Sequence, residues 1–156
     1  MKKVFALALC LLLLAQGILP ASGAALSTAE PAGTLLYRQE TVLENGLTLI
    51  DEVYEYAQGR STDKTGTRTL TIRNSDNVVL GIISFEAVFR YDGSTVSVVS
   101  KTVTQTDTYE GYSYKQSSFT SSGGTVTLAG KLTKLLIFNH SFTMSLTCDV
   151  NGNLSY

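Results

Sequence analysis

The sequence of 156 residues contains no tryptophan, a single histidine and two prolines, and its one long apolar run lies at the start. Lysine and arginine total 12 residues against 13 acidic ones, and no stretch concentrates positive charge as binding to nucleic acid requires. We therefore expect no nucleic-acid partner. We also expect no membrane association once the first apolar run has been removed, because an anionic membrane selects for the same clustered charge.

The first 24 residues have the pattern of a secretory signal peptide. Lys2 and Lys3 give a positive start, the apolar run covers residues 4–14, and small residues around Ala24 offer a cleavage site. The run is shorter than the roughly 20 residues that a resident membrane helix needs. The sequence therefore predicts a signal peptide at residues 1–24 and a protein that is secreted to the extracellular space.

The rest of the chain has the size of one domain. Residues 25–33 are mostly small and include a proline, which predicts a flexible lead-in before a single domain at residues 34–156. A domain of this length stays folded without a disulfide or a metal, so we expect no metal and no cofactor. Cys148 would be the only cysteine left after cleavage, and we expect it to be a buried, unpaired thiol in a monomer.

Thr-rich and β-branched segments separated by turn residues predict an all-β chain from residue 67 onward. Residues 78–91 have the longest apolar face and are predicted to form the central strand, and a change of phase within residues 95–106 predicts a β-bulge. Residues 47–57 fit either a helix or a strand, of which we favour the strand. Turns or loops are predicted at residues 44–47, 59–66, 74–77, 92–93, 121–124, 139–141 and 151–152.

The last long segment has the most regular pattern. Residues 141–150 alternate without a fault, which puts Phe142, Met144, Leu146 and Cys148 on one face. Seven or eight short antiparallel strands in a chain of this size pack most economically as two facing sheets. We therefore predict an antiparallel β-sandwich, with a partly open β-barrel as the alternative.

One predicted loop contains patterns found in serine acylating enzymes of the penicillin-recognising class. S-x-x-K runs from Ser61 to Lys64, K-T-G begins at Lys64, and S-D-N begins at Ser75. In those enzymes two separate lysines occupy a helix and a late strand, whereas here one lysine serves both patterns. We interpret the match as chance, predict that Ser61 is inert, and assign no catalytic residue.

Other reactive patterns are equally incomplete. His140 is predicted to lie in a surface loop, and no G-x-S-x-G nucleophile motif accompanies it. The segment from Asp149 to Asn153 has the first half of a calcium loop but lacks the bidentate glutamate that such a loop requires. A hairpin turn explains this segment better.

Three tyrosines are the candidate ligand-binding residues. Tyr109, Tyr112 and Tyr114 lie close together in the chain beside polar residues, which is the combination that stacks on a sugar or a peptide. Tyr112 and Tyr114 also alternate at the spacing of core residues. Both interpretations, ligand contact and core packing, stay open at this point.

Four stretches occur in a distinctive order: KTGTRTLTIRNSDN, then FEAVFRYDGSTVSV, then GYSYKQSS with a GG turn and TVTLAGKL, and finally SLTCDVNGNLS. This succession resembles a group of small secreted β-rich proteins of Gram-positive bacteria that have no assigned activity. The resemblance implies no catalytic residue.

We predict a secreted, non-catalytic binding or interaction module that acts at the cell envelope or in the extracellular surroundings. Its expected partners are glycans or proteins. The alternative is a small secreted hydrolase, or a secreted inhibitor or antimicrobial protein.

Overall fold

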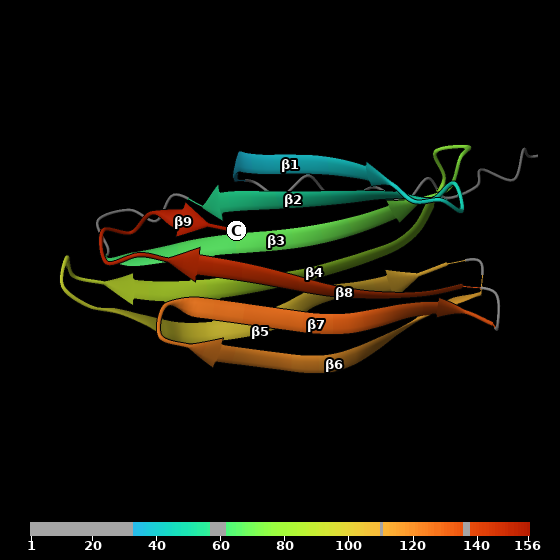
Figure 1. Ribbon diagram of the computed structural model, residues 1–156. Coiled ribbons are helices and arrows are strands. Elements are labelled where there is room, and N and C mark those ends of the chain that lie inside the picture. The colour runs from blue at the N-terminus through green and yellow to red at the C-terminus, as the bar shows by residue number, and fades with distance from the viewer. Residues whose placement is uncertain (1–32, 57–61, 110, 136–137) are drawn as a thin grey trace, which may run out of the picture. The chain divides into compact units, whose positions relative to one another are not determined.

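The computed structural model describes residues 33–56, 62–109, 111–135 and 138–156, so the predicted signal peptide lies outside the described residues. No helix in the described part of the chain is long and apolar enough to cross a membrane. These residues form nine strands joined by turns (Figure 1). The strands are β1 (Thr34–Val42), β2 (Thr48–Tyr56), β3 (Asp63–Arg73), β4 (Val79–Tyr91), β5 (Val96–Thr108), β6 (Tyr112–Ser122), β7 (Thr125–Lys134), β8 (Phe138–Cys148) and β9 (Leu154–Ser155).

The strands form two antiparallel sheets, which confirms the predicted β-sandwich. Sheet A contains β1 to β5 and sheet B contains β6 to β9, and within each sheet the strands are paired in chain order. The sheets face each other across one apolar core, in which Phe85 and Phe89 of sheet A and Leu128 and Leu146 of sheet B are fully buried. No described strand pairs with both sheets, so the barrel alternative is wrong.

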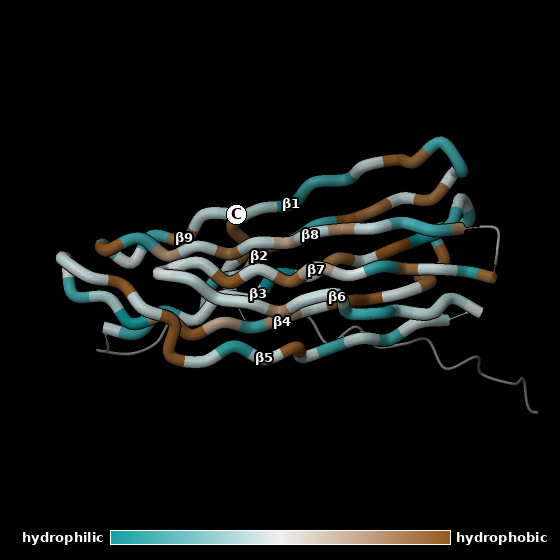
Figure 2. The backbone as a smooth tube through the Cα atoms, turned by 60° about the horizontal axis from the view of Figure 1, so that its bottom comes forward, coloured by the Kyte–Doolittle hydropathy of each residue, from teal (hydrophilic) through white to brown (hydrophobic). Residues whose placement is uncertain are grey.

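Alternation along the strands builds this core and can be followed in Figure 2. Residues 47–57 were ambiguous by pattern, and β2 confirms that most of them form a strand. The predicted central strand, now β4, is second from the edge, and β3 is the middle strand of sheet A. Most residues of β4 are nevertheless buried, because Leu80 and Ile82 are covered in addition to the predicted face.

The predicted β-bulge occurs in β5. The register between β4 and β5 shifts so that Val99 has no partner in β4. The sequence pattern predicted Val99 on the apolar side, which is wrong: the residue is 49% exposed because it is the bulged one. A second shift leaves Thr104 unpaired in the same strand. Each unpaired residue reverses which residues of β5 face the core. As a result, Val98 and Val103 both pack against the core although they are five residues apart.

Two turns close one end of the sandwich. Asp92 accepts hydrogen bonds from the backbone N–H groups of Ser94 and Thr95, at 2.9 and 2.7 Å, and these bonds hold the β4–β5 turn and lower the pKa of Asp92. The backbone N–H of Gly93 donates to the carbonyl of Val150 at 2.9 Å. That bond joins the β4–β5 turn of sheet A to the β8–β9 turn of sheet B.

The calcium-like segment is the β8–β9 turn, as predicted. Both carboxylate oxygens of Asp149 accept hydrogen bonds within it: the side chain of Asn153 donates at 2.8 Å, and the backbone N–H groups of Asn151 and Asn153 also donate at 2.8 Å. These bonds lower the pKa of Asp149, the Asn153 side chain contributing most. Gly152 has φ +83°, and the ring of Tyr91 occupies the place of the missing Cβ.

Two predicted loops are wrong in the described residues. The loop at residues 59–66 ends early, because β3 begins at Asp63 and Gly66 pairs with Glu55 and Ala87. The loop at residues 139–141 is part of β8, which begins at Phe138 and pairs with β7. In both places pairing with a neighbouring strand overrides the local turn preference. Gly66 also lets sheet B approach, since a Cβ there would lie 2.8 Å from the side chains of Leu146 and Leu154.

Candidate functional site

Tyr112 and Tyr114 point toward the core from the start of β6. Tyr112 is opposite Lys134, and its ring meets that of Phe138 edge-on with centroids 5.7 Å apart. The ring of Tyr114 stacks on Phe142 at 6.0 Å. Both tyrosines are partly buried and pack against the core cluster. The structure therefore gives both residues a packing role.

The three tyrosines differ in what they offer a ligand. The hydroxyl of Tyr114 is buried without a hydrogen-bond partner among the described residues, and burial raises its pKa. The backbone N–H of Tyr109 donates a hydrogen bond to the carbonyl oxygen of Leu80 at 2.8 Å. The ammonium of Lys134 lies 4.8 Å from the ring centroid of Tyr112. Ligand binding by Tyr109, Tyr112 and Tyr114 stays a prediction.

His140 lies in β8 rather than in a loop. It is opposite Leu132, which is buried, and its ring stacks on Phe138 with centroids 6.2 Å apart. Its half-buried imidazole thus belongs to the aromatic cluster of Tyr112 and Phe138. No hydrogen bond joins His140 to a carboxylate among the described residues, so the pairing that a histidine base needs is not formed there.

The acylating-enzyme patterns fall on unrelated elements. Ser61 lies outside the described residues, and Lys64 is a residue of β3 whose ammonium pairs with Glu55 of β2 at 2.5 Å. Ser75 lies in the β3–β4 turn, where Asn77 takes a left-handed conformation with φ +64°. Lys64 therefore acts as a partner of Glu55 in sheet A.

The described part of the chain shows neither a cluster of metal-binding side chains nor an accessible thiol. No three His, Cys, Asp or Glu residues gather there in a way that could hold a metal ion. Cys148 is 1% exposed and lies in the core, which confirms the burial predicted from alternation. Burial raises the pKa of its thiol, which disfavours the reactive thiolate.

The charged side chains of sheet A are mostly paired with one another. Arg68 is the best-connected of them: it binds both carboxylate oxygens of Asp51, and it also donates to the carbonyl oxygen of Ser145 on β8. The remaining ion pairs found between described residues join Arg38 to Glu40 and Glu52, Lys64 to Glu55, and Arg90 to Asp63, at 2.5 to 2.8 Å.

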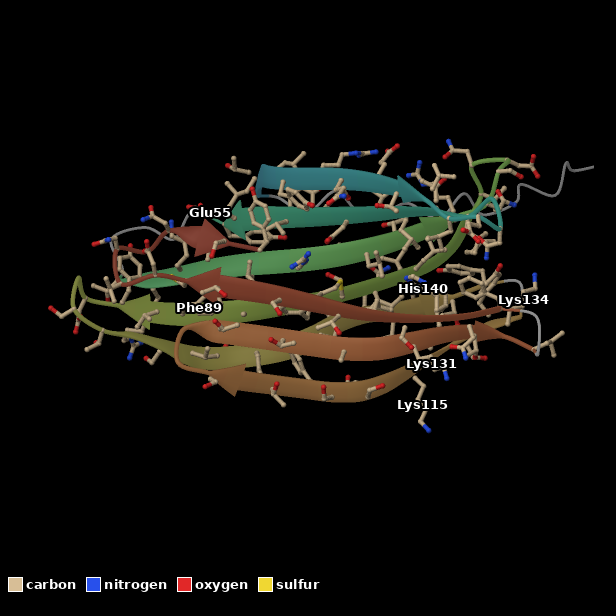
Figure 3. The ribbon with its side chains drawn as sticks, in the orientation of Figure 1. Glu55, Phe89, Lys115, Lys131, Lys134 and His140 are labelled. Carbon is tan, nitrogen blue, oxygen red and sulfur yellow. The ribbon has the colours of Figure 1, made fainter. Side chains whose placement is uncertain are left out.

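The strands of sheet B contain no aspartate or glutamate. They carry Lys115, Lys131 and Lys134, all near the end of the sheet at which β6 begins (Figure 3). Among the described residues, no carboxylate forms an ion pair with any of the three lysines. Sheet B therefore has positive charge that the described residues leave uncompensated.

Two of these lysines lie directly opposite each other on the outer surface. Lys115 of β6 pairs in register with Lys131 of β7. Lys131 is next to Leu132, which points into the core, so Lys131 points outward. Figure 3 shows the two side chains leaving the sheet side by side. Together with their polar neighbours they form the surface that we call the lysine face: Ser113, Lys115, Lys131, Thr133, Asn139 and Ser141.

Farther along sheet B the outer side chains are hydroxyls that satisfy each other. Thr125 bonds to Thr147 at 2.9 Å, and Thr127 bonds to Ser145 at 3.0 Å, across neighbouring strands. The lysine face has no such ladder between its side chains. The hydroxyl of Thr133 donates instead to the backbone carbonyl of Ser113, at 3.5 Å.

The sequence contained a signal for the lysine face that the sequence analysis missed. From residue 111 to residue 148 there is no acidic side chain, although the whole chain carries 13. Segregation of charge by sheet becomes visible only when the strands are assigned to sheets.

A scan against protein-family models, a search of curated proteins and a search of solved structures each found no match to this chain.

Proposed function

We propose that this protein is a secreted, non-catalytic binding module that acts at the cell envelope or in the extracellular surroundings, and that the lysine face is its contact surface. The observation that carries this proposal is the uncompensated positive charge of sheet B. Folded proteins generally balance closely opposed charges within the fold, as sheet A does. Charge left unbalanced at a polar surface favours a role in association.

The chemistry of the lysine face suits a glycan or a polar protein surface. Ser113, Thr133, Asn139 and Ser141 supply hydroxyl and amide groups that both donate and accept hydrogen bonds. Glycan hydroxyls require partners of this kind. Tyr112 lies at the same end of β6, but its ring points toward the core and so is not part of the lysine face.

The proposal is tested by blocking the lysine face without changing its charge. Ser141 is exposed and opposite Lys131, so Ser141→Tyr places a bulky ring over the face. We expect this variant to lose most of the binding to envelope fractions that the unaltered protein shows in a sedimentation assay. Thr102→Tyr is the matched control, because Thr102 is exposed on sheet A.

Two results would count against the proposal. Equal binding by Ser141→Tyr and the unaltered protein would remove the lysine face from the contact. Failure of the unaltered protein to bind any envelope fraction would remove the function itself. N-terminal sequencing of protein from the culture medium tests export separately, and we expect a start close to Ala25.

A further inference from the structure

We propose that the partner of the lysine face is an anionic glycan, a sugar polymer that carries phosphate or carboxylate groups along its length. This inference rests on the proposed function and names the class of ligand for the same surface. It assigns Lys115 and Lys131 as the two residues that hold the anionic group. The neighbouring polar side chains hold the sugar.

The register of the two lysines is the first argument. Side chains directly opposite each other on antiparallel strands have Cβ atoms about 5 Å apart, and like charges at such positions destabilise the sheet. Lys115 and Lys131 occupy one such pair, and no described carboxylate neutralises either of them. An anion placed between the two ammonium groups would convert this repulsion into two charge-assisted hydrogen bonds.

The arrangement of polar residues around the lysines is the second argument. Ser113, Thr133 and Asn139 form one row across three strands, and Lys115, Lys131 and Ser141 form the next row. Rows on one side of a strand are about 7 Å apart, since a strand rises about 3.4 Å per residue. A sugar that carries an anionic group can therefore meet the lysine row with its charge and the polar row with its hydroxyls.

The lysine face lacks the features of two other polyanion partners. Its two rows contain no aromatic side chain on which unpaired bases could stack and no arginine for phosphate recognition. They also contain no apolar side chain that could enter a lipid layer. Leu135 is 80% exposed, but it follows the end of β7 and lies outside both rows.

Binding of the purified protein to four probes tests the inference. Polygalacturonate supplies carboxylates, a phosphodiester-linked mannan supplies phosphates, dextran is neutral, and vesicles of phosphatidylglycerol present an anionic lipid. We expect binding to one or both charged glycans and none to dextran. High salt should abolish this binding, because it screens exposed charges.

Substitutions then test whether Lys115 and Lys131 supply the positive charge that binds the glycan. Lys115→Gln combined with Lys131→Gln should weaken glycan binding by about tenfold or more, whereas the Lys→Arg pair should retain it. Arg38→Gln combined with Arg90→Gln is the matched control, because it removes two exposed positive charges from sheet A. That control should leave glycan binding within about twofold.

The contrary outcomes separate this inference from the proposed function. Equal binding to dextran and no effect of the lysine variants would overturn the anionic ligand and leave a neutral glycan-binding module. Binding to vesicles alone, lost in Leu135→Ser, would replace the glycan by a lipid surface. No binding to any probe or envelope fraction would overturn both proposals.

Discussion

Sheets A and B contribute to one apolar core, but their charged residues are arranged differently. Sheet A contains acidic and basic residues on neighbouring strands, and its ion pairs join β1 to β2, β2 to β3, and β3 to β4. Sheet B contains three lysines and no acid in its strands. Charged residues of sheet A therefore pair within the fold, whereas the described residues offer Lys115 and Lys131 no ion-pair partner, and we propose that these two lysines bind a ligand.

The largest loss of stability is expected when a paired charge of sheet A is removed. Arg68→Met leaves the carboxylate of Asp51, 22% exposed, without its partner and frees the carbonyl of Ser145. We expect the free energy of unfolding to fall by about 3 kcal/mol, at the low end for a buried pair because some exposure remains. Urea denaturation measures it.

The double variant Arg68→Met with Asp51→Leu sharpens this prediction. Replacing both charges by apolar side chains should restore most of the lost stability, because no unpaired charge remains. If the double variant is no more stable than Arg68→Met, the loss comes from packing or from the bond to Ser145, and the contrast between the sheets is weakened.

Sheet B should instead be most sensitive to packing. Gly130 lies beneath the stacked rings of Tyr114 and Phe142, and a Cβ at Gly130 would lie 2.5 Å from the Tyr114 ring. We expect Gly130→Ala to lower the free energy of unfolding by about 2 kcal/mol through overpacking. Ala129→Ser, on the outer surface, is the control and should change it by less than about 0.5 kcal/mol. Equal stability of the two variants would contradict this account.

The pH dependence of stability provides a third test, which concerns the turn next to β8. Asp149 adjoins β8, but its carboxylate accepts hydrogen bonds from its own turn, and these lower its pKa. The unfolded pKa is about 3.9, so this contribution to stability is complete above that value and is lost as the pH falls through the lower folded pKa. Thermal unfolding followed from neutral to acidic pH should show a shallower decline for Asp149→Ala than for the unaltered protein. An identical decline would mean that Asp149 gains nothing from folding.

The smallest effect concerns the lysines themselves. Lys131→Gln relieves the repulsion with Lys115 and should raise the free energy of unfolding by about 0.3 kcal/mol. Lys134→Gln loses the contact with the Tyr112 ring and should lower it by about 0.5 kcal/mol. Denaturant unfolding of both variants beside the unaltered protein measures these changes. A clear loss of stability in Lys131→Gln would show that Lys131 serves the fold after all.

The sequence predicted the fold well where one strand carries its own pattern. The alternation around Cys148 and the phase change at Val99 were both sufficient, because a strand with one buried side needs no knowledge of its neighbours. Predictions failed at Gly66 and His140, where pairing with another strand decides the structure. Local composition cannot report such pairing.

The lysine face was not predicted, although the stretch without acidic residues pointed to it, because its geometry also depends on strand register. The register of β6 against β7 shifts between Gln116 and Ser118, which leaves Ser117 unpaired. Without that shift, Lys115 would be opposite Leu132 and would point into the core. One extra residue in β6 therefore moves a lysine from the buried surface to the outer one; the odd spacing between Tyr114 and Phe119, which both pack against the core, is the sign of it in the sequence.

The strand order has a consequence for how the chain folds. Because the strands within each sheet pair with their neighbours in the sequence, each sheet is a succession of hairpins with short contact distances along the chain, and such local contacts favour fast folding. Docking of the two sheets is the one long-range event. Ile83, Phe85 and Phe89 of sheet A are buried in one cluster with residues of β7 and β8, so among the described residues their burial depends on sheet B. Neither sheet can therefore persist alone in water, and the domain should unfold in a single cooperative transition.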